Sequence, residues 1–119
     1  MKKIAMVLTA LALCGCVDMG RVGMHPKVKT AYLNAHRHVG TDCLYQAAYR
    51  QHLSMEKDDP LPGGTERYNL LDKNYETVAW LDASPFGKKQ TSVDFYYGPD
   101  EPEIERSIEA MISQCKNPF

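Results

Sequence analysis

The sequence lacks an excess of positive charge. Its 119 residues contain 14 Lys and Arg against 15 Asp and Glu, and the formal net charge at pH 7 is −1. Residues 1–15 carry only the charges of Lys2 and Lys3, so the rest of the chain has a net charge of −3, which is −1 minus their +2. Because phosphate binding requires clustered Lys and Arg, we expect no nucleic acid as a partner.

Motifs of the common catalytic and cofactor sites are also missing. No serine lies in a nucleophile-elbow pattern, no glycine-rich phosphate loop occurs, and there is no His-Glu-x-x-His. Glu101, Glu103 and Glu105 alternate at the start of a predicted helix, so their side chains would point to different faces and could not form an acid and base pair. Their negative charges would instead interact favourably with the helix dipole at its N-terminus. We therefore expect neither an enzyme nor a cofactor.

A long hydrophobic run is absent from the start of the chain. The apolar run of residues 4–13 follows Lys2 and Lys3 and has Thr9 as its one polar residue. As a helix it would rise about 15 Å, half of the roughly 30 Å hydrocarbon core of a bilayer. The run is therefore too short to span a membrane and is typical of a signal peptide.

The next four residues are Leu13, Cys14, Gly15 and Cys16. This quartet resembles the lipobox of bacterial lipoprotein precursors, with a leucine three positions before the cysteine and a small residue directly before it. Acylation of Cys14 is disfavoured because Leu13 would then occupy the place of the small residue. Cleavage elsewhere, with Cys16 as an ordinary cysteine of a secreted protein, is the other alternative.

The resemblance implies that residues 1–15 are removed and that Cys16 receives lipid, which anchors the mature chain in a membrane. In the sorting rule of enteric lipoproteins, Asp directly after the cysteine favours the inner membrane. Val17 takes that place here. The resemblance thus implies an outer-membrane lipoprotein, and we expect its folded part to face the periplasm.

Only Cys43 and Cys115 then remain as cysteines. In an oxidising compartment two such thiols are expected to form a disulfide. It would close a loop of about 73 residues and contribute on the order of 4 kcal/mol. Two reduced, buried thiols are the alternative. No metal site is expected, since neither cysteine has a second Cys or a His at the short spacing of a zinc knuckle.

Residues 16–40 mix Gly, Pro, Lys and His without a sustained apolar period, which predicts a lipidated N-terminus and flexible tether with at most one helical turn near Tyr32. A small domain is expected over residues 41–119. It would begin with a helix over 41–54 that Thr41 or Asp42 caps. A loop over 55–65, rich in Pro and Gly, would follow.

Alternating and turn-forming residues predict strands over 66–71, 75–81 and 91–97. A last helix would open with Asp100 and Glu103 as a capping box. Its residues 104, 108, 111, 112 and 115 form one apolar stripe. The sequence therefore predicts an α+β fold of order α-β-β-β-α, with a three-stranded antiparallel meander, two helices on one face and a disulfide bracing them.

Short connections throughout would make these two helices parallel and place Cys43 and Cys115 roughly 20 Å apart. A disulfide requires Cα atoms about 5.5–6 Å apart. We therefore expect the loop over 55–65 to cross the fold, so that the helices pack side by side and antiparallel.

Four residues are candidates for an interaction site. Phe86 lies at a predicted hairpin tip beside Lys88 and Lys89, and Tyr96 points away from the predicted core face. Exposed aromatic side chains beside lysines are suited to a protein or glycan contact, and folding back onto the domain is the alternative.

The leading hypothesis is a non-catalytic structural or protein-interaction lipoprotein with a protein partner in the envelope. A binding or inhibitory module for a periplasmic enzyme or small ligand is the second, with the loop 55–65 and Phe86 as its rim. A weaker third is metal handling through His25, His36 and His38 of the tether.

Overall fold

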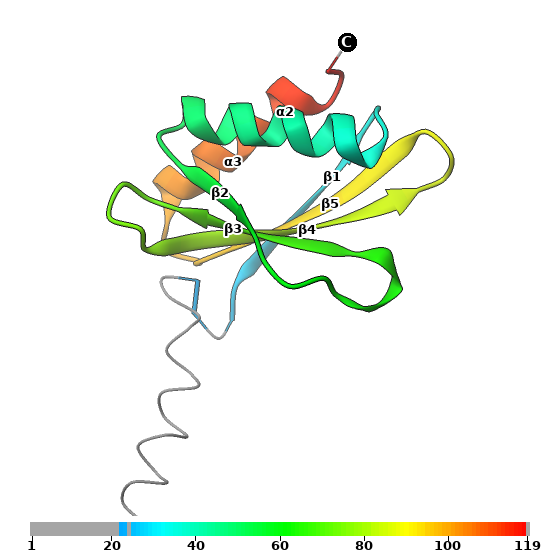
Figure 1. Cartoon of the computed structure of the whole chain (residues 1–119). Coiled ribbons are helices and arrows are strands. Elements are labelled where there is room, and N and C mark those ends of the chain that lie inside the picture. Colours follow the sequence, from blue (N-terminus) through cyan, green and yellow to red (C-terminus); the bar gives the residue numbers. More distant parts are fainter. Residues whose placement is uncertain (1–21, 24, 119) are drawn as a thin grey trace, which may run out of the picture.

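An antiparallel sheet covered on one face by two helices forms the part of the chain that the computed structural model describes, residues 22–23 and 25–118 (Figure 1). The elements are β1 (Lys27–Leu33), α2 (Arg37–Arg50), β2 (Ser54–Lys57), β3 (Glu66–Leu71), β4 (Thr77–Phe86), β5 (Gln90–Tyr97) and α3 (Pro102–Cys115), with a short 3-10 turn at Pro62–Gly64. The order of strands in the sheet is β1-β5-β4-β3-β2. The α+β class is confirmed.

The predicted meander corresponds to β3, β4 and β5, the centre of the sheet, but the prediction of three strands is wrong because β1 and β2 add to its edges. The tether prediction for residues 16–40 also fails from Lys27 onward, since β1 pairs with β5 along its whole length. Residues 1–15 and Cys16 lie outside the described residues.

The sequence pattern of β1 hides its strand character. Lys27 and Lys29 share the helix-facing side with Ala31 and Leu33, while the other side carries Val28, so polar and apolar residues occur on both faces. No clean alternation results, and pattern reasoning takes the segment for a tether.

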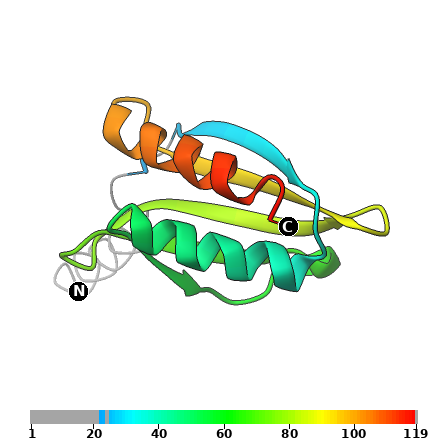
Figure 2. The same ribbon diagram turned by 90° about the horizontal axis from the view of Figure 1, so that it is seen from above.

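Strand β2 reverses the chain and so sets the direction of α2. Three residues separate it from the end of α2, and it pairs antiparallel with β3. This extra reversal makes α2 and α3 antiparallel, and the two helices lie side by side on one sheet face (Figure 2). The predicted arrangement of the helices is confirmed, but a strand and a hairpin produce it rather than a loop that crosses the fold.

Both helices begin at other residues than predicted. His36 is the N-cap of α2, and Thr41 lies inside the helix, where its hydroxyl donates to the carbonyl of Arg37 at 2.8 Å. Helix α3 has Glu101 as N-cap and Pro102 at its first position, so the predicted capping box is wrong. Proline fits there because the first turn needs no N–H from it. Neither helix is long and apolar enough to cross a membrane.

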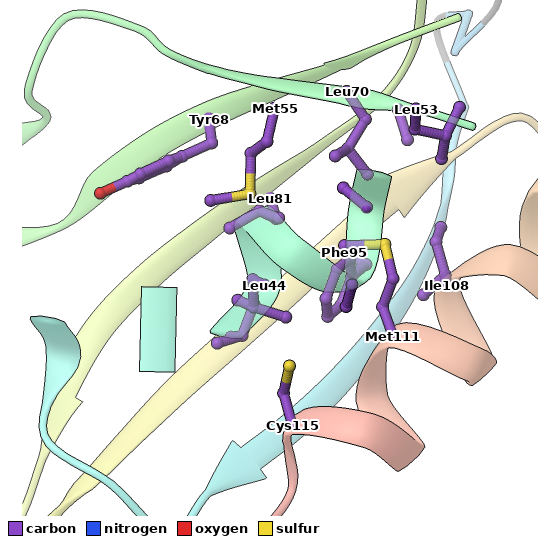
Figure 3. Packing of buried hydrophobic residues seen from close by; sticks show 14 of the residues in the cluster. Leu44, Leu53, Met55, Tyr68, Leu70, Leu81, Phe95, Ile108, Met111 and Cys115 are labelled. Atoms are coloured by element: carbon purple, nitrogen blue, oxygen red, sulfur yellow. The ribbon is translucent and has the colours of Figure 1, made fainter. Parts of the chain in front are cut away.

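The core lies between the sheet and the helices (Figure 3). Leu81 of β4 and Phe95 of β5 are paired neighbours in the sheet, and both are fully buried. The stripe predicted for α3 meets them, with these residues buried: Ile104, Ile108, Met111 and Cys115. Helix α2 contributes Leu44, Ala47 and Ala48. The core face that alternation predicts for the central strands is thereby confirmed.

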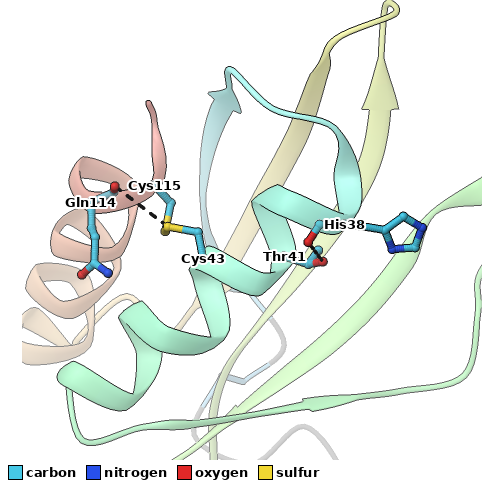
Figure 4. Close-up of a disulfide and its surroundings, with 5 residues drawn as sticks. All are labelled: His38, Thr41, Cys43, Gln114 and Cys115. Carbon is cyan, nitrogen blue, oxygen red and sulfur yellow. Dashed lines mark hydrogen bonds between the residues drawn. A yellow bond between two sulfur atoms is a disulfide. The ribbon is translucent and has the colours of Figure 1, made fainter. Parts of the chain in front are cut away.

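The predicted disulfide between Cys43 and Cys115 is present, with Cα atoms 5.7 Å apart (Figure 4). Cys43 lies in the middle of α2, and Cys115 is the last residue of α3. The bond therefore joins the two helices directly above the core.

The turn between β3 and β4 also matches the sequence prediction. The carboxylate of Asp72 accepts the N–H groups of Asn74 at 2.8 Å and Glu76 at 3.0 Å. Tyr75 has a φ of 60° in this turn. Strand β4 therefore begins at Thr77, two residues later than predicted.

Candidate functional site

No helix of the described residues covers the second face of the sheet, which we call the open face (Figure 1). It carries every other residue of each strand, so that β1 presents Val28, Thr30 and Tyr32 there. Two of these side chains are large and apolar, and Val28 is 57% exposed. The open face therefore displays apolar surface at its β1 edge.

Phe86 joins this surface at the β4–β5 hairpin. Its ring centroid lies 4.8 Å from that of Tyr32. The two rings support each other, yet Phe86 remains 49% and Tyr32 48% exposed. Both predicted outcomes for Phe86 are thus met in part, because the ring rests on the domain and still presents half of its surface to solvent.

A depression of about 540 Å³ lies beside Phe86, and we call it the hairpin-end site. It is lined by Asn34, Phe86, Gly87, Lys88, Lys89 and Gln90. The turn that forms one wall depends on Gly87, whose φ of 65° is readily adopted by glycine. The depression contains aromatic, amide and ammonium groups and is suited to a ligand with apolar and anionic parts.

Amide hydrogen bonds hold the floor of the hairpin-end site in place. Gln90 Nε2 donates to Asn34 Oδ1 at 2.6 Å, and Asn34 Nδ2 donates to Asn117 Oδ1 at 2.5 Å. These bonds join the start of β5, the end of β1 and the segment after α3. The site is therefore attached to three parts of the fold, although its rim is a hairpin turn.

Lys88 and Lys89 give the site its charge. Ion pairs among the described residues include five other cations and neither of these lysines. The site-lining residues contain no carboxylate. An anionic group that approaches the hairpin would therefore meet two ammonium groups with no competing carboxylate in the site.

Tyr96 belongs to a different part of the open face. It stacks on Trp80, with ring centroids 5.7 Å apart, and the guanidinium of Arg67 lies 5.2 Å from the Trp80 ring centroid. Burial, followed by the nearby charges of Asp82 and Asp94, raises the pKa of Tyr96. The prediction that Tyr96 points away from the core is confirmed, but Tyr96 is not part of the hairpin-end site.

The segment predicted as the rim loop 55–65 has its own charged cluster. Glu66 forms ion pairs with Arg37, whose Nε lies 2.8 Å away, and with Lys57, whose Nζ lies 3.0 Å away, and it accepts the Tyr68 hydroxyl at 2.8 Å. Hydrogen bonds from Lys57 and Tyr68 hold the pKa of Glu66 below its ordinary value. A shallow depression of about 230 Å³ adjoins the cluster. Glu66 already balances the cations there, so this second depression is less suited to anions than the hairpin-end site.

The three histidines of the metal hypothesis lie in different settings. His25 precedes β1, His36 caps α2, and His38 is in the first turn of that helix. The described residues contain no group of three metal-ligating side chains.

Sequence reasoning missed Tyr32, Asn34 and Gln90. Tyr32 was assigned to the tether, although its spacing of two from Thr30 and four from Val28 is the strand period of the open face. No local sequence pattern predicts that Asn34 and Gln90 contact each other, because 56 positions separate them along the chain. Only the pairing of β1 with β5 brings them together.

Comparison with known proteins yields no match, neither to a protein-family model nor to a curated protein. The function of the chain is therefore inferred from its own residues.

Proposed function

We propose that this chain is a non-catalytic lipoprotein of the bacterial outer membrane, anchored by an acylated Cys16, that binds a protein partner in the periplasm. The lipobox-like quartet ending at Cys16 supports the anchor. The Cys43–Cys115 disulfide supports an oxidising compartment, because structural disulfides persist mainly outside the cytosol.

The observation that carries the binding role is the half-exposed Phe86 beside Lys88 and Lys89. Aromatic side chains are enriched in the energetically dominant parts of protein interfaces. Lys88 and Lys89 form no ion pair among the described residues, and two such lysines speed the encounter with an oppositely charged surface. The partner is accordingly a protein that offers an apolar side chain to Phe86 and carboxylates to the lysines.

The position of the site agrees with an anchor at the start of the chain. Lys27 at the start of β1 pairs with Tyr97, whereas the hairpin-end site adjoins Gln90 at the other end of β5. Eight residues of extended strand span about 26 Å. The hairpin therefore projects away from the end of the sheet where β1 begins (Figure 2). A domain tethered at Cys16 would direct it away from the membrane.

Mass spectrometry of the chain processed in its host tests the anchor. We expect a mature N-terminus at Cys16 with the mass of attached acyl chains. A product that begins elsewhere and carries no lipid would overturn this part of the proposal.

Crosslinking followed by pull-down from solubilised envelopes tests the binding role. We expect one protein to recur with the native chain and to be lost with the double change Lys88→Glu and Lys89→Glu. Lys73→Glu, in the turn between β3 and β4, is the matched control, because it changes charge at the other end of the sheet. Equal recovery with all variants would contradict a role for the hairpin-end site.

A binding or inhibitory module is the second candidate, and the size of the hairpin-end site favours it. A depression of about 540 Å³ is within the size range of small-molecule sites. Under this candidate, the captured protein is an enzyme that loses activity when the native chain is added. Under the leading proposal, its activity does not change.

A further inference from the structure

The two edges of the sheet differ in how they are protected. An edge strand presents unpaired N–H and C=O groups that can pair with another strand. Strand β2 has only four residues, and Glu56 and Lys57 are exposed on it, which discourages pairing. Strand β1 has seven residues and presents Val28 and Tyr32 on the open face. Of the two edges, β1 is the one suited to receive a further strand.

Lysines on an edge strand usually block such pairing. Those of β1 are drawn toward α3 instead. Lys29 Nζ lies 2.7 Å from Glu109 Oε1, and Lys27 Nζ lies 3.8 Å from Glu105 Oε2. Their charges are thus balanced on the helix side of the sheet, and the edge itself is left without a repelling charge.

A groove of about 210 Å³ runs along this edge between β1 and α3. It is lined by Thr30, Ala31, Tyr32, Ile112 and Lys116. In strand addition, side chains of the incoming strand enter depressions beside the edge while the backbones form hydrogen bonds. The groove is placed to receive a side chain of a strand paired with β1.

We propose that β1 pairs antiparallel with β1 of a second copy of this chain, about a two-fold axis at Thr30. In this register Val28 faces Tyr32 of the second copy, a favourable pair of β-branched and aromatic side chains. Thr30 faces its own equivalent. The aliphatic stem of Lys29 lies opposite Ala31 and covers the apolar part of the groove.

Neighbouring registers are worse. An axis at Lys29 would leave Tyr32 and Leu33 opposite residues that precede the start of β1. An axis at Ala31 would leave Lys27 and Val28 opposite residues beyond the end of β1. The axis at Thr30 pairs all seven residues of the strand and opposes no two like charges.

Helix α3 adds charge complementarity across the same axis. Glu105 lies near the start of β1, and Lys116 lies at its end, where its carbonyl accepts the N–H of Asn34 at 2.9 Å. Because the two copies of β1 are antiparallel, Lys116 approaches Glu105 of the second copy. Lys116 has no carboxylate partner among the residues that the structure describes.

This dimer goes beyond the proposed function and holds whether or not the hairpin-end site has a partner. Crosslinking of the full chain at position 30, on the proposed two-fold axis, tests the dimer. In Thr30→Cys the two new thiols face each other, so a short bis-maleimide should yield a covalent dimer. Ser92→Cys, on the open face of the interior strand β5, is the matched control and should give no covalent dimer.

Sedimentation of the full chain in detergent supplies a second readout. We expect a monomer–dimer equilibrium whose dissociation constant rises at least tenfold with Thr30→Asp, because this change places two carboxylates at the axis beside Asp94 of each copy. Thr30→Ser should leave the dissociation constant unchanged. Circular dichroism confirms that each variant is folded. A chain that stays monomeric up to its solubility limit overturns the proposal. So does a dimer that tolerates Thr30→Asp, or a Thr30→Cys product that contains another protein.

Discussion

Cys43 in the middle of α2 and Cys115 at the end of α3 are joined by a disulfide that ties together two helices lying side by side on the sheet. They are separated by 72 positions along the chain, and the segment between them contains all strands except β1. The bond therefore restricts most of the domain in its unfolded state.

The double change Cys43→Ser and Cys115→Ser should lower the free energy of unfolding by on the order of 4 kcal/mol, because a loop of this length loses much entropy when it is closed. Each kcal/mol corresponds to a shift of about 4–8 °C in Tm for a domain of this size. Thermal unfolding of both forms, followed by circular dichroism, measures the difference. An unchanged Tm would show that helix packing alone holds α2 against α3.

Replacement of Glu66 by glutamine should destabilise the domain at neutral pH by about 1.5–3 kcal/mol, the contribution of hydrogen bonds to a charged group. In the folded chain, hydrogen bonds from Lys57 and Tyr68 lower the pKa of Glu66 below 4.5. Its contribution is therefore complete above pH 4.5 and is lost as the pH falls through the lowered pKa.

The destabilisation by Glu66→Gln should accordingly shrink as the pH is lowered below about 4.5. Urea unfolding at a series of pH values measures it. Glu56→Gln, on the exposed strand β2, is the control and should have little effect at any pH. A loss that grows toward acid pH would contradict the ion pairs of Glu66 with Arg37 and Lys57.

Phe86→Ala should separate binding from stability. The side chain is 49% exposed, so its removal should reduce the free energy of unfolding by only about 1 kcal/mol. Partner recovery in the pull-down should nevertheless fall at least as much as with the double change Lys88→Glu and Lys89→Glu, because aromatic residues dominate binding energy.

Tyr49→Ala is the control for Phe86→Ala, since Tyr49 is 81% exposed on α2. It should change neither stability nor recovery. Loss of partner with both variants would indicate a nonspecific effect of removing exposed aromatic surface.

Arg67→Lys should change the environment of Trp80, the single tryptophan of the chain. Arg67 forms two hydrogen bonds to Asp82, at 2.7 and 2.8 Å, while its guanidinium lies over the indole ring. Lysine cannot form both bonds in this fork geometry. We expect a shifted tryptophan emission and a loss of about 0.5–1 kcal/mol in stability. Arg50→Lys, at the end of α2, should leave the emission unchanged.

Much of the central fold could be predicted from local pattern. The stripe of α3 and the alternation of β5 follow the periods of helix and strand, and Asp72 identifies the turn between β3 and β4. If Cys14 and Cys16 belong to the expected lipobox, Cys43 and Cys115 leave a single possible disulfide. That bond in turn required antiparallel helices. These features could be predicted because each depends on neighbours in sequence or on a single possible pairing.

The edges of the sheet and the hairpin-end site could not be predicted in this way. The strand period places Lys27 and Lys29 on the side of the buried Ala31 and Leu33. Glu105 and Glu109 of α3, distant in sequence, balance their charges there. Tyr32 supports Phe86 only because β1 pairs with β5, far away along the chain. The sequence alone determined the three central strands and the two helices, and it led to the expected pairing of Cys43 with Cys115. The tertiary structure decided which strand forms the edge and which side chains meet at the hairpin, because such contacts depend on long-range pairing that no local period encodes.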